Sequence, residues 1–179
     1  AWVMFARTAG GGGRTWSVPM LLAGLFFAGD LAVWHFSILF TTVANATLLA
    51  NLAPIFVAVG GYLLFGQRVT PLLLVGMVTA MAGAFVLVGP SFAAGGMRLL
   101  GDALGVLTAV FYGAYFLAIK HLRDSRSTAS IMAASTTVTA VVLLPIALAT
   151  GEAMLPHSPS GWLVLLGLAL VCQVGGQSL

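Results

Sequence analysis

Residues 31–67 read LAVWHFSILFTTVANATLLANLAPIFVAVGGYLLFGQ and contain no Asp, Glu, Lys or Arg. One helix crosses the hydrocarbon core of a bilayer with about 20 residues. An uncharged run of this length is therefore too long for a single crossing. We expect it to complete one membrane helix, turn, and form the next, which predicts a polytopic membrane protein.

The composition of the whole chain agrees with this expectation. Its 179 residues are 60% hydrophobic and only 6% charged, whereas soluble domains carry about 25% charged residues. The one cysteine, Cys172, excludes a disulfide framework and argues against a thiolate metal site. The net charge of +3 comes from basic residues scattered over the chain, and such scattered charges do not form a nucleic-acid-binding surface.

The turn signals divide the chain into six expected helices. Gly89-Pro90 is typical of a helix stop, and Gly101-Asp102 is typical of a helix start, with Asp102 accepting the first backbone N–H groups. Residues 1–6 resemble the tail of an earlier helix, and both ends of the chain are interpreted as cut. The expected helices cover residues 17–39, 43–66, 69–89, 102–122, 129–150 and 162–179.

The basic residues fall almost entirely on one side of this layout. Loops on the other side hold only Arg98. Because cytoplasmic loops carry the excess of Lys and Arg, residues 7–16 are expected in the cytoplasm and the last helix is expected to run inward. The residues on the cytoplasmic side are Arg7, Arg14, Arg68, Lys120, Arg123 and Arg126.

A faint internal repeat links two helices of opposite direction. When Trp16 is aligned with Trp162, Leu22 meets Leu168 and Gly29 meets Gly175. Helix 17–39 is expected to run outward and helix 162–179 inward. Related segments of opposite orientation indicate an inverted repeat, which is a common architecture of secondary transporters.

Two longer stretches resemble a known family. Residues 37–89, SILFTTVANATLLANLAPIFVAVGGYLLFGQRVTPLLLVGMVTAMAGAFVLVG, resemble the second half of an EamA domain, the repeat of the drug/metabolite transporter (DMT) superfamily. Residues 101–123, GDALGVLTAVFYGAYFLAIKHLR, resemble the opening helix of a second EamA repeat. The family usually has Glu in the turn between the two helices of this segment, where this chain has Gln67. Any role of that acid is therefore absent here.

The resemblance implies an all-α bundle of ten transmembrane helices in two inverted repeats, of which this chain covers roughly the end of helix 2 to helix 8. Residues 1–100 would form the first EamA repeat without its N-terminal part. Residues 101–179 would form the second repeat without its C-terminal part. The implied function is secondary active transport, as a permease or exporter, of small organic metabolites or drugs across the bacterial inner (plasma) membrane.

Asp30 stands in the middle third of helix 17–39. An acid at that depth is costly unless it faces the bundle interior or a wet cavity, and it marks a functional site by default. We interpret Asp30 as a substrate-binding or proton-coupling group. The alternative is a structural acid that hydroxyls or amides of neighbouring helices satisfy. Trp34 lies one turn away on the same face and would either line a pocket or anchor the helix at the membrane interface.

The next helix carries a polar stripe in which Thr47, Asn51 and Pro54 share one face. Pro54 has no N–H to donate, so a carbonyl one turn earlier is left free. Transporters build midplane sites from such interrupted helices, although interhelical hydrogen bonding alone would explain the same stripe. The candidate residues that line the site, besides Asp30, are Trp34, Asn45, Asn51, Tyr115 and Gln173.

The sequence offers no paired catalytic groups, zinc-protease motif or phosphate-binding loop. We therefore expect no enzyme activity, no metal and no cofactor. The expected partners are membrane lipids and a small organic solute but no nucleic acid, and homo-oligomer formation stays open. A small-multimer membrane assembly partner or a lipid-carrier flippase-like subunit is the alternative function.

Overall fold

The computed structural model describes residues 17–150, 158–168 and 170–171, and the secondary structure in these ranges is helical throughout, without strands. Five segments are long and apolar enough to cross a membrane, which confirms an all-α, polytopic membrane bundle. The helices are α2 (Val18–Phe40), α3 (Val43–Ala50), α4 (Ala53–Phe65), α5 (Pro71–Ala94), α6 (Gly96–Arg123), α7 (Thr128–Thr150) and α8 (Pro159–Gly167).

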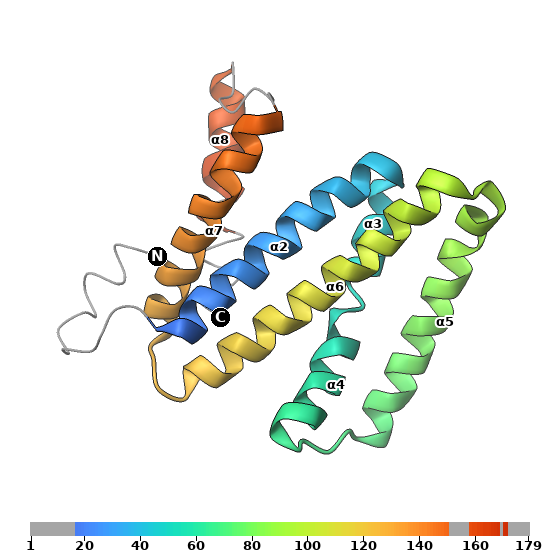
Figure 1. Cartoon of the computed structure of the whole chain (residues 1–179), viewed down its shortest axis with the longest axis horizontal. Coiled ribbons are helices and arrows are strands. Elements are labelled where there is room, and N and C mark those ends of the chain that lie inside the picture. Colours follow the sequence, from blue (N-terminus) through green and yellow to red (C-terminus); the bar gives the residue numbers. More distant parts are fainter. Residues whose placement is uncertain (1–16, 151–157, 169, 172–179) are drawn as a thin grey trace.

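Helices α2 and α6 lie side by side and antiparallel, and they form the most extensive contact of the bundle (Figure 1). Helix α7 packs on α2, while α3 and α4 pack on α6. Small residues on α6 allow this close approach: Ala109 is fully buried, and a Cβ added to Gly113 would lie 2.9 Å from the Cβ of Phe56. Ala109 and Gly113 lie four positions apart on one face of α6 and form a stripe of small residues along which helices pack closely.

Helix α5 stands at the edge of the bundle (Figure 1), and its main contacts among the described elements are with α6 and α3. No residue of its most apolar window is buried in the described bundle. A Cβ added to Gly76 would meet nothing within 4 Å. Gly76, Ala80 and Ala84 form a similar stripe of small residues on α5, but among the described residues no other helix packs against Gly76.

The turn between α5 and α6 differs from the sequence prediction. Pro90 was expected to end its helix, but it lies inside α5, which continues to Ala94. A proline removes one backbone hydrogen bond, and membrane helices tolerate that loss. The chain reverses instead at Gly95 and Gly96, whose φ values of +63° and +58° suit glycine. As a result, α6 begins at Gly96 and Asp102 lies inside the helix, not at its start.

Residues 43–66, expected as one helix, form two. Helix α3 ends at Ala50, α4 begins at Ala53, and a turn at Asn51 and Leu52 separates them. The break comes one turn before Pro54, as the missing N–H of a proline leads one to expect. The two pieces together still span the length of one membrane crossing. Of the expected helix 162–179, the structure describes the beginning, within α8.

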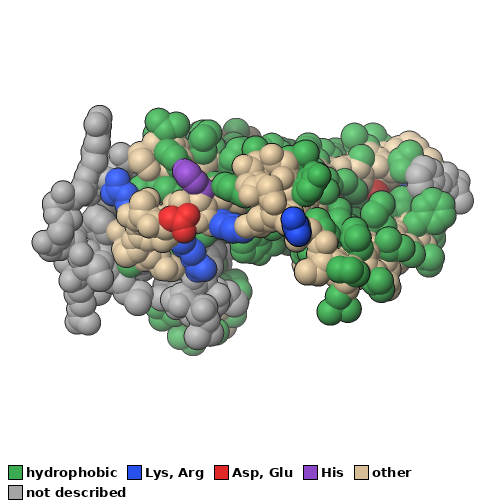
Figure 2. Space-filling model, turned by 90° about the horizontal axis from the view of Figure 1, so that it is seen from below, with side chains coloured by type: hydrophobic (Ala, Val, Ile, Leu, Met, Phe, Trp, Pro, Cys, Tyr) green, Lys and Arg blue, Asp and Glu red, His purple; other side chains and the backbone are tan. Residues whose placement is uncertain are grey.

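The charged side chains define the two ends of the bundle. The α4–α5 and α6–α7 turns lie at one end, called here the basic end, which holds Arg68, Lys120, Arg123 and Arg126. Figure 2, seen from below relative to Figure 1, shows Lys and Arg side chains gathered on one face. The opposite end, with the α2–α3 and α5–α6 turns, holds Arg98. This division agrees with the topology expected from the sequence.

Candidate functional site

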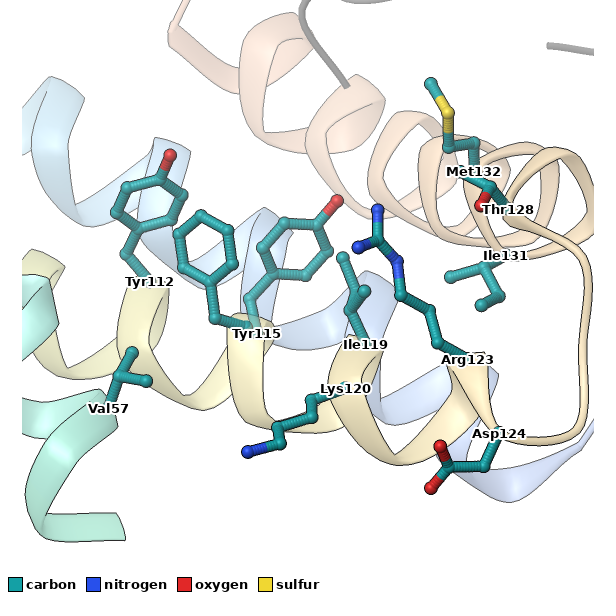
Figure 3. Close-up of a pocket in the computed structure, with 11 residues that line it drawn as sticks. Val57, Tyr112, Tyr115, Ile119, Lys120, Arg123, Asp124, Thr128, Ile131 and Met132 are labelled. Atoms are coloured by element: carbon teal, nitrogen blue, oxygen red, sulfur yellow. The ribbon is translucent and has the colours of Figure 1, made fainter. Parts of the chain in front are cut away.

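A pocket of about 550 Å³ opens near the basic end of α6 (Figure 3). Helices α4, α6 and α7 form its walls. It combines aromatic rings, aliphatic side chains, two cations, one acid and hydroxyl groups, which is the mixed lining typical of sites for small organic molecules. The residues that line it are Val57, Tyr112, Tyr115, Phe116, Ile119, Lys120, Arg123, Asp124, Thr128, Ile131 and Met132.

Aromatic rings form one wall of the pocket. The Tyr112 and Phe116 ring centroids are 4.7 Å apart, and those of Tyr115 and Phe116 are 5.9 Å apart. Behind them, Phe27 of α2 stacks on Tyr115 with a centroid distance of 4.8 Å. Contacts of this kind hold aromatic rings in fixed orientations. Tyr115 also forms a side-chain hydrogen bond with Ser135 of α7, so three helices fix this ring.

Asp30 lies near the tyrosines of the pocket wall. Its side chain is 8% exposed, and it does not itself line the pocket. The carboxylate interacts electrostatically with Tyr112 and Tyr115. The preceding residue, Gly29, allows α2 to approach α6, because a Cβ there would lie 2.8 Å from the Phe111 ring. The structure thus brings together two predicted site residues, Asp30 and Tyr115.

Three other predicted site residues do not join this group. Trp34 lines a separate pocket of about 350 Å³ between α2 and α7, so Asp30 and Trp34 do not face a common cavity. Asn51 is exposed at the break between α3 and α4. Gln173 lies outside the described residues.

Asn45, the remaining predicted residue, belongs to a buried hydrogen-bond network at the opposite end of α6. Its Nδ2 donates to Oδ1 of Asp102 over 3.3 Å. The hydroxyl of Thr41 donates to the same oxygen over 2.5 Å, and the hydroxyl of Ser37 donates to the carbonyl of Gly101 over 2.7 Å. We call these four contacting residues and Gly101 the α2–α6 joint. The joint ties the end of α2 and the start of α3 to α6.

Asp102 is the residue that the sequence prediction placed wrongly. It was expected to cap a helix, but it is only 2% exposed and lies within α6. Its second oxygen, Oδ2, is buried and has no hydrogen-bond partner among the described residues. The Gly95-Gly96 pair was the available signal, because it marks a turn that starts α6 earlier and moves Asp102 into the helix.

Two cations of the pocket were counted in the sequence as topology markers and not as site residues. Lys120 Nζ lies 5.8 Å from the centroid of the Phe65 ring, a cation–π contact. Arg123 interacts electrostatically with Tyr115. Lys120 and Arg123 follow Phe116 by four and seven residues, which places their backbone positions on the same face of α6. This spacing was the available sequence signal.

No group of three or more His, Cys, Asp or Glu side chains that could hold a metal ion occurs in the described ranges. The pocket's polar groups are instead hydroxyls, two cations and a single carboxylate. This set can bind the polar or charged groups of an organic molecule while the rings contact its carbon frame.

Comparison with known proteins supports the resemblance seen in the sequence. Residues 99–179 match the EamA-like transporter family. The chain is also 27% identical over 174 residues to the pseudopaline exporter CntI of Pseudomonas aeruginosa, in strain UCBPP-PA14 and equally in strain PAO1. The alignment covers 96% of this chain and 60% of the exporter, so the chain spans well under the full length of these relatives. No solved structure matches the chain significantly.

These matches confirm the predicted EamA resemblance, and residues 99–179 carry an EamA-like transporter domain. The domain match begins within α6, at the helix that was identified as the opening of the second repeat.

Proposed function

We propose that this chain is the larger part of a secondary transporter that moves a small organic metabolite across the bacterial inner membrane. The observation that carries the proposal is the 550 Å³ pocket, which lies among membrane helices and combines aromatic and charged groups. Similarity along nearly the whole chain to a bacterial exporter supports the same class of function and favours export as the direction.

The proposed architecture is a pair of inverted EamA repeats, residues 1–100 and residues 101–179, each incomplete in this chain. Helices α2 and α6 belong to different repeats and form the main contact between them. Rocking of one repeat against the other would open the pocket alternately to the two sides of the membrane. The basic end faces the cytoplasm by the positive-inside rule.

In this proposal Asp30 is the proton-coupling residue. Its burial, and its electrostatic contact with two tyrosines of the pocket wall, support the role. An acid at this depth can exchange a proton as the pocket changes its exposure to water. Tyr115 would transmit that change to the pocket, because its ring contacts α2 and its hydroxyl contacts α7.

The test uses the product of the complete open reading frame that encodes this chain, reconstituted in liposomes. The liposomes are loaded with a small-molecule extract of the source bacterium, and released compounds are identified by mass spectrometry. Release of at least one metabolite, driven by an ion gradient, supports the proposal. Liposomes that release none beyond the protein-free control contradict it and favour the assembly-partner alternative.

Asp30 is tested in the same assay with two variants. We expect Asp30→Asn to lower release about tenfold or more and to remove its dependence on the proton gradient, while Asp30→Glu retains part of that dependence. Equal release rates and equal pH profiles for the wild type and Asp30→Asn would contradict the coupling role.

A further inference from the structure

The charges in the pocket point to a class of solute. Two of its lining residues, Lys120 and Arg123, are cations, and one, Asp124, is an acid. All three come from the last turn of α6 and the residue that follows it. The orientation of these side chains decides which charge a solute would meet inside the pocket.

Figure 3 shows that the three charged groups do not point in the same direction. The Arg123 guanidinium extends beside Tyr115, on the side toward which the tyrosine hydroxyls point. The Asp124 carboxylate points the other way. No carboxylate of the described residues lies within the 4.0 Å of an ion pair with Arg123, so the guanidinium can bind another anion.

Lys120 is placed differently from Arg123. Its ammonium group points away from the tyrosine hydroxyls and lies over the Phe65 ring of α4. The cation that shares a side with the tyrosine hydroxyls is therefore Arg123. A guanidinium binds a carboxylate through two parallel N–H donors.

The remaining walls suit the carbon frame of the same molecule. The rings of Tyr112 and Phe116 and the side chains of Ile131 and Met132 provide an apolar surface beside the guanidinium. A ring or chain that leaves water for these walls gains the hydrophobic contribution, while the carboxylate keeps its charge-assisted hydrogen bonds. A small cation would find Arg123 repulsive at the same place.

We propose that this pocket selects organic anions, specifically carboxylates with an apolar or aromatic frame, and that Arg123 is the residue that binds the carboxylate. The inference rests on the proposed transport function and adds the chemical class of the solute. It is independent of Asp30, which does not line the pocket.

The test compares three compounds that share one frame: 3-phenylpropionate, its uncharged amide and the cation 3-phenylpropylamine. Equilibrium binding of each radiolabelled compound to the purified full-length protein is measured in detergent. We expect the carboxylate to bind at least about tenfold more tightly than the amide, because a charge-assisted bidentate pair is lost in the amide. The amine is expected to bind more weakly still.

Substitutions then assign the preference to one side chain. Arg123→Gln is expected to bind the carboxylate and the amide equally, and Arg123→Lys is expected to retain a smaller preference. Arg68→Gln is the matched control, because Arg68 is exposed at the same end of the bundle and does not line the pocket. Thermal unfolding in detergent shows whether each variant is folded before its binding is compared.

The outcomes separate this inference from the function on which it rests. If the wild type binds the amide or the amine as well as the carboxylate, binds none of them, or loses its preference in Arg68→Gln as fully as in Arg123→Gln, the inference is wrong. A transported metabolite that is neutral or cationic would overturn it as well, and would leave the transport function standing. A protein that shows the carboxylate preference but releases no metabolite contradicts the transport proposal alone.

Discussion

The two ends of α6 have opposite constructions. At the end of α6 that holds Arg98, the α2–α6 joint combines buried hydroxyl, amide and carboxylate groups with a glycine that lets two backbones come into contact. At the basic end, aromatic and charged side chains surround a pocket of about 550 Å³. The same helix is therefore closely packed at one end and open at the other. In the proposed transporter, this difference would correspond to a state in which the solute path is open toward the basic end.

Gly101 explains why the helices are closely packed at the joint. A Cβ added to Gly101 would lie 2.6 Å from the backbone N of Thr41 and 2.8 Å from the carbonyl carbon of Phe40. Only a residue without a side chain fits there. Once the backbones meet, the nearby polar side chains are buried and bond to one another or to a backbone carbonyl, with Oδ2 of Asp102 as the exception.

The largest effect is expected from Gly101→Ala, which breaks the joint directly. The added methyl meets backbone atoms that cannot rotate away, and overpacking of this kind costs about 3 kcal/mol. Thermal unfolding in detergent, followed by size-exclusion chromatography, measures the loss. Gly76→Ala is the control, because a Cβ there meets nothing within 4 Å. A melting temperature for Gly101→Ala equal to that of Gly76→Ala would show that the close contact is absent.

A smaller loss, about 2 kcal/mol, is expected from Asp102→Ala. The substitution leaves the Thr41 hydroxyl and the buried Asn45 amide without their shared acceptor, and an unsatisfied buried donor costs about 1–3 kcal/mol. The same unfolding measurement applies. Asp124→Asn changes an exposed acid at the basic end and should alter the melting temperature little. Equal effects of the two substitutions would mean that the joint does not stabilise the bundle.

The smallest effect is expected where α7, the helix that also supplies one wall of the pocket, is bonded to α2. Thr139 of α7 donates a hydrogen bond to the Gly24 carbonyl of α2 over 3.0 Å. Thr139→Val removes that bond at nearly constant volume, and interhelical bonds in membranes average about 0.6 kcal/mol. Thr150→Val is the control, since Thr150 bonds within its own helix. A loss from Thr139→Val as large as that from Gly101→Ala would remove the contrast between the closed joint and the pocket wall.

The sequence predicted the fold better than the site. Uncharged runs and turn residues located all five membrane spans of the described chain, because a bilayer leaves few ways to place an apolar helix. The main error followed from one local signal. Pro90 was interpreted as a helix stop, although a proline within a membrane helix loses only one hydrogen bond, and the true reversal lies at Gly95 and Gly96.

The sequence could predict a site residue only where placing that residue in a membrane helix costs free energy and so calls for a functional explanation. Asp30 stood out because an acid in an apolar helix needs a partner, but its nearness to Tyr112 depends on which faces of α2 and α6 meet. Asn45 was expected near Asp30 and instead bonds Asp102, a partner that depends on the true start of α6. Arg123 was missed because a basic residue at the cytoplasmic end of a helix is already explained by the positive-inside rule. The direction of its side chain depends on how the helices pack.

Labelling of introduced cysteines tests the central claim, that the pocket is a solute path open at the basic end and closed at the joint. Ile119→Cys in the pocket and Ser37→Cys in the joint are made in the full-length protein with Cys172 replaced by Ser, and a membrane-impermeant maleimide is applied to one side at a time. The prediction is rapid reaction at position 119 from the cytoplasmic side only, slowed when a transported solute is present, and no reaction at position 37. Reaction at position 37 as fast as at position 119, or reaction at 119 that the solute does not slow, would contradict the account.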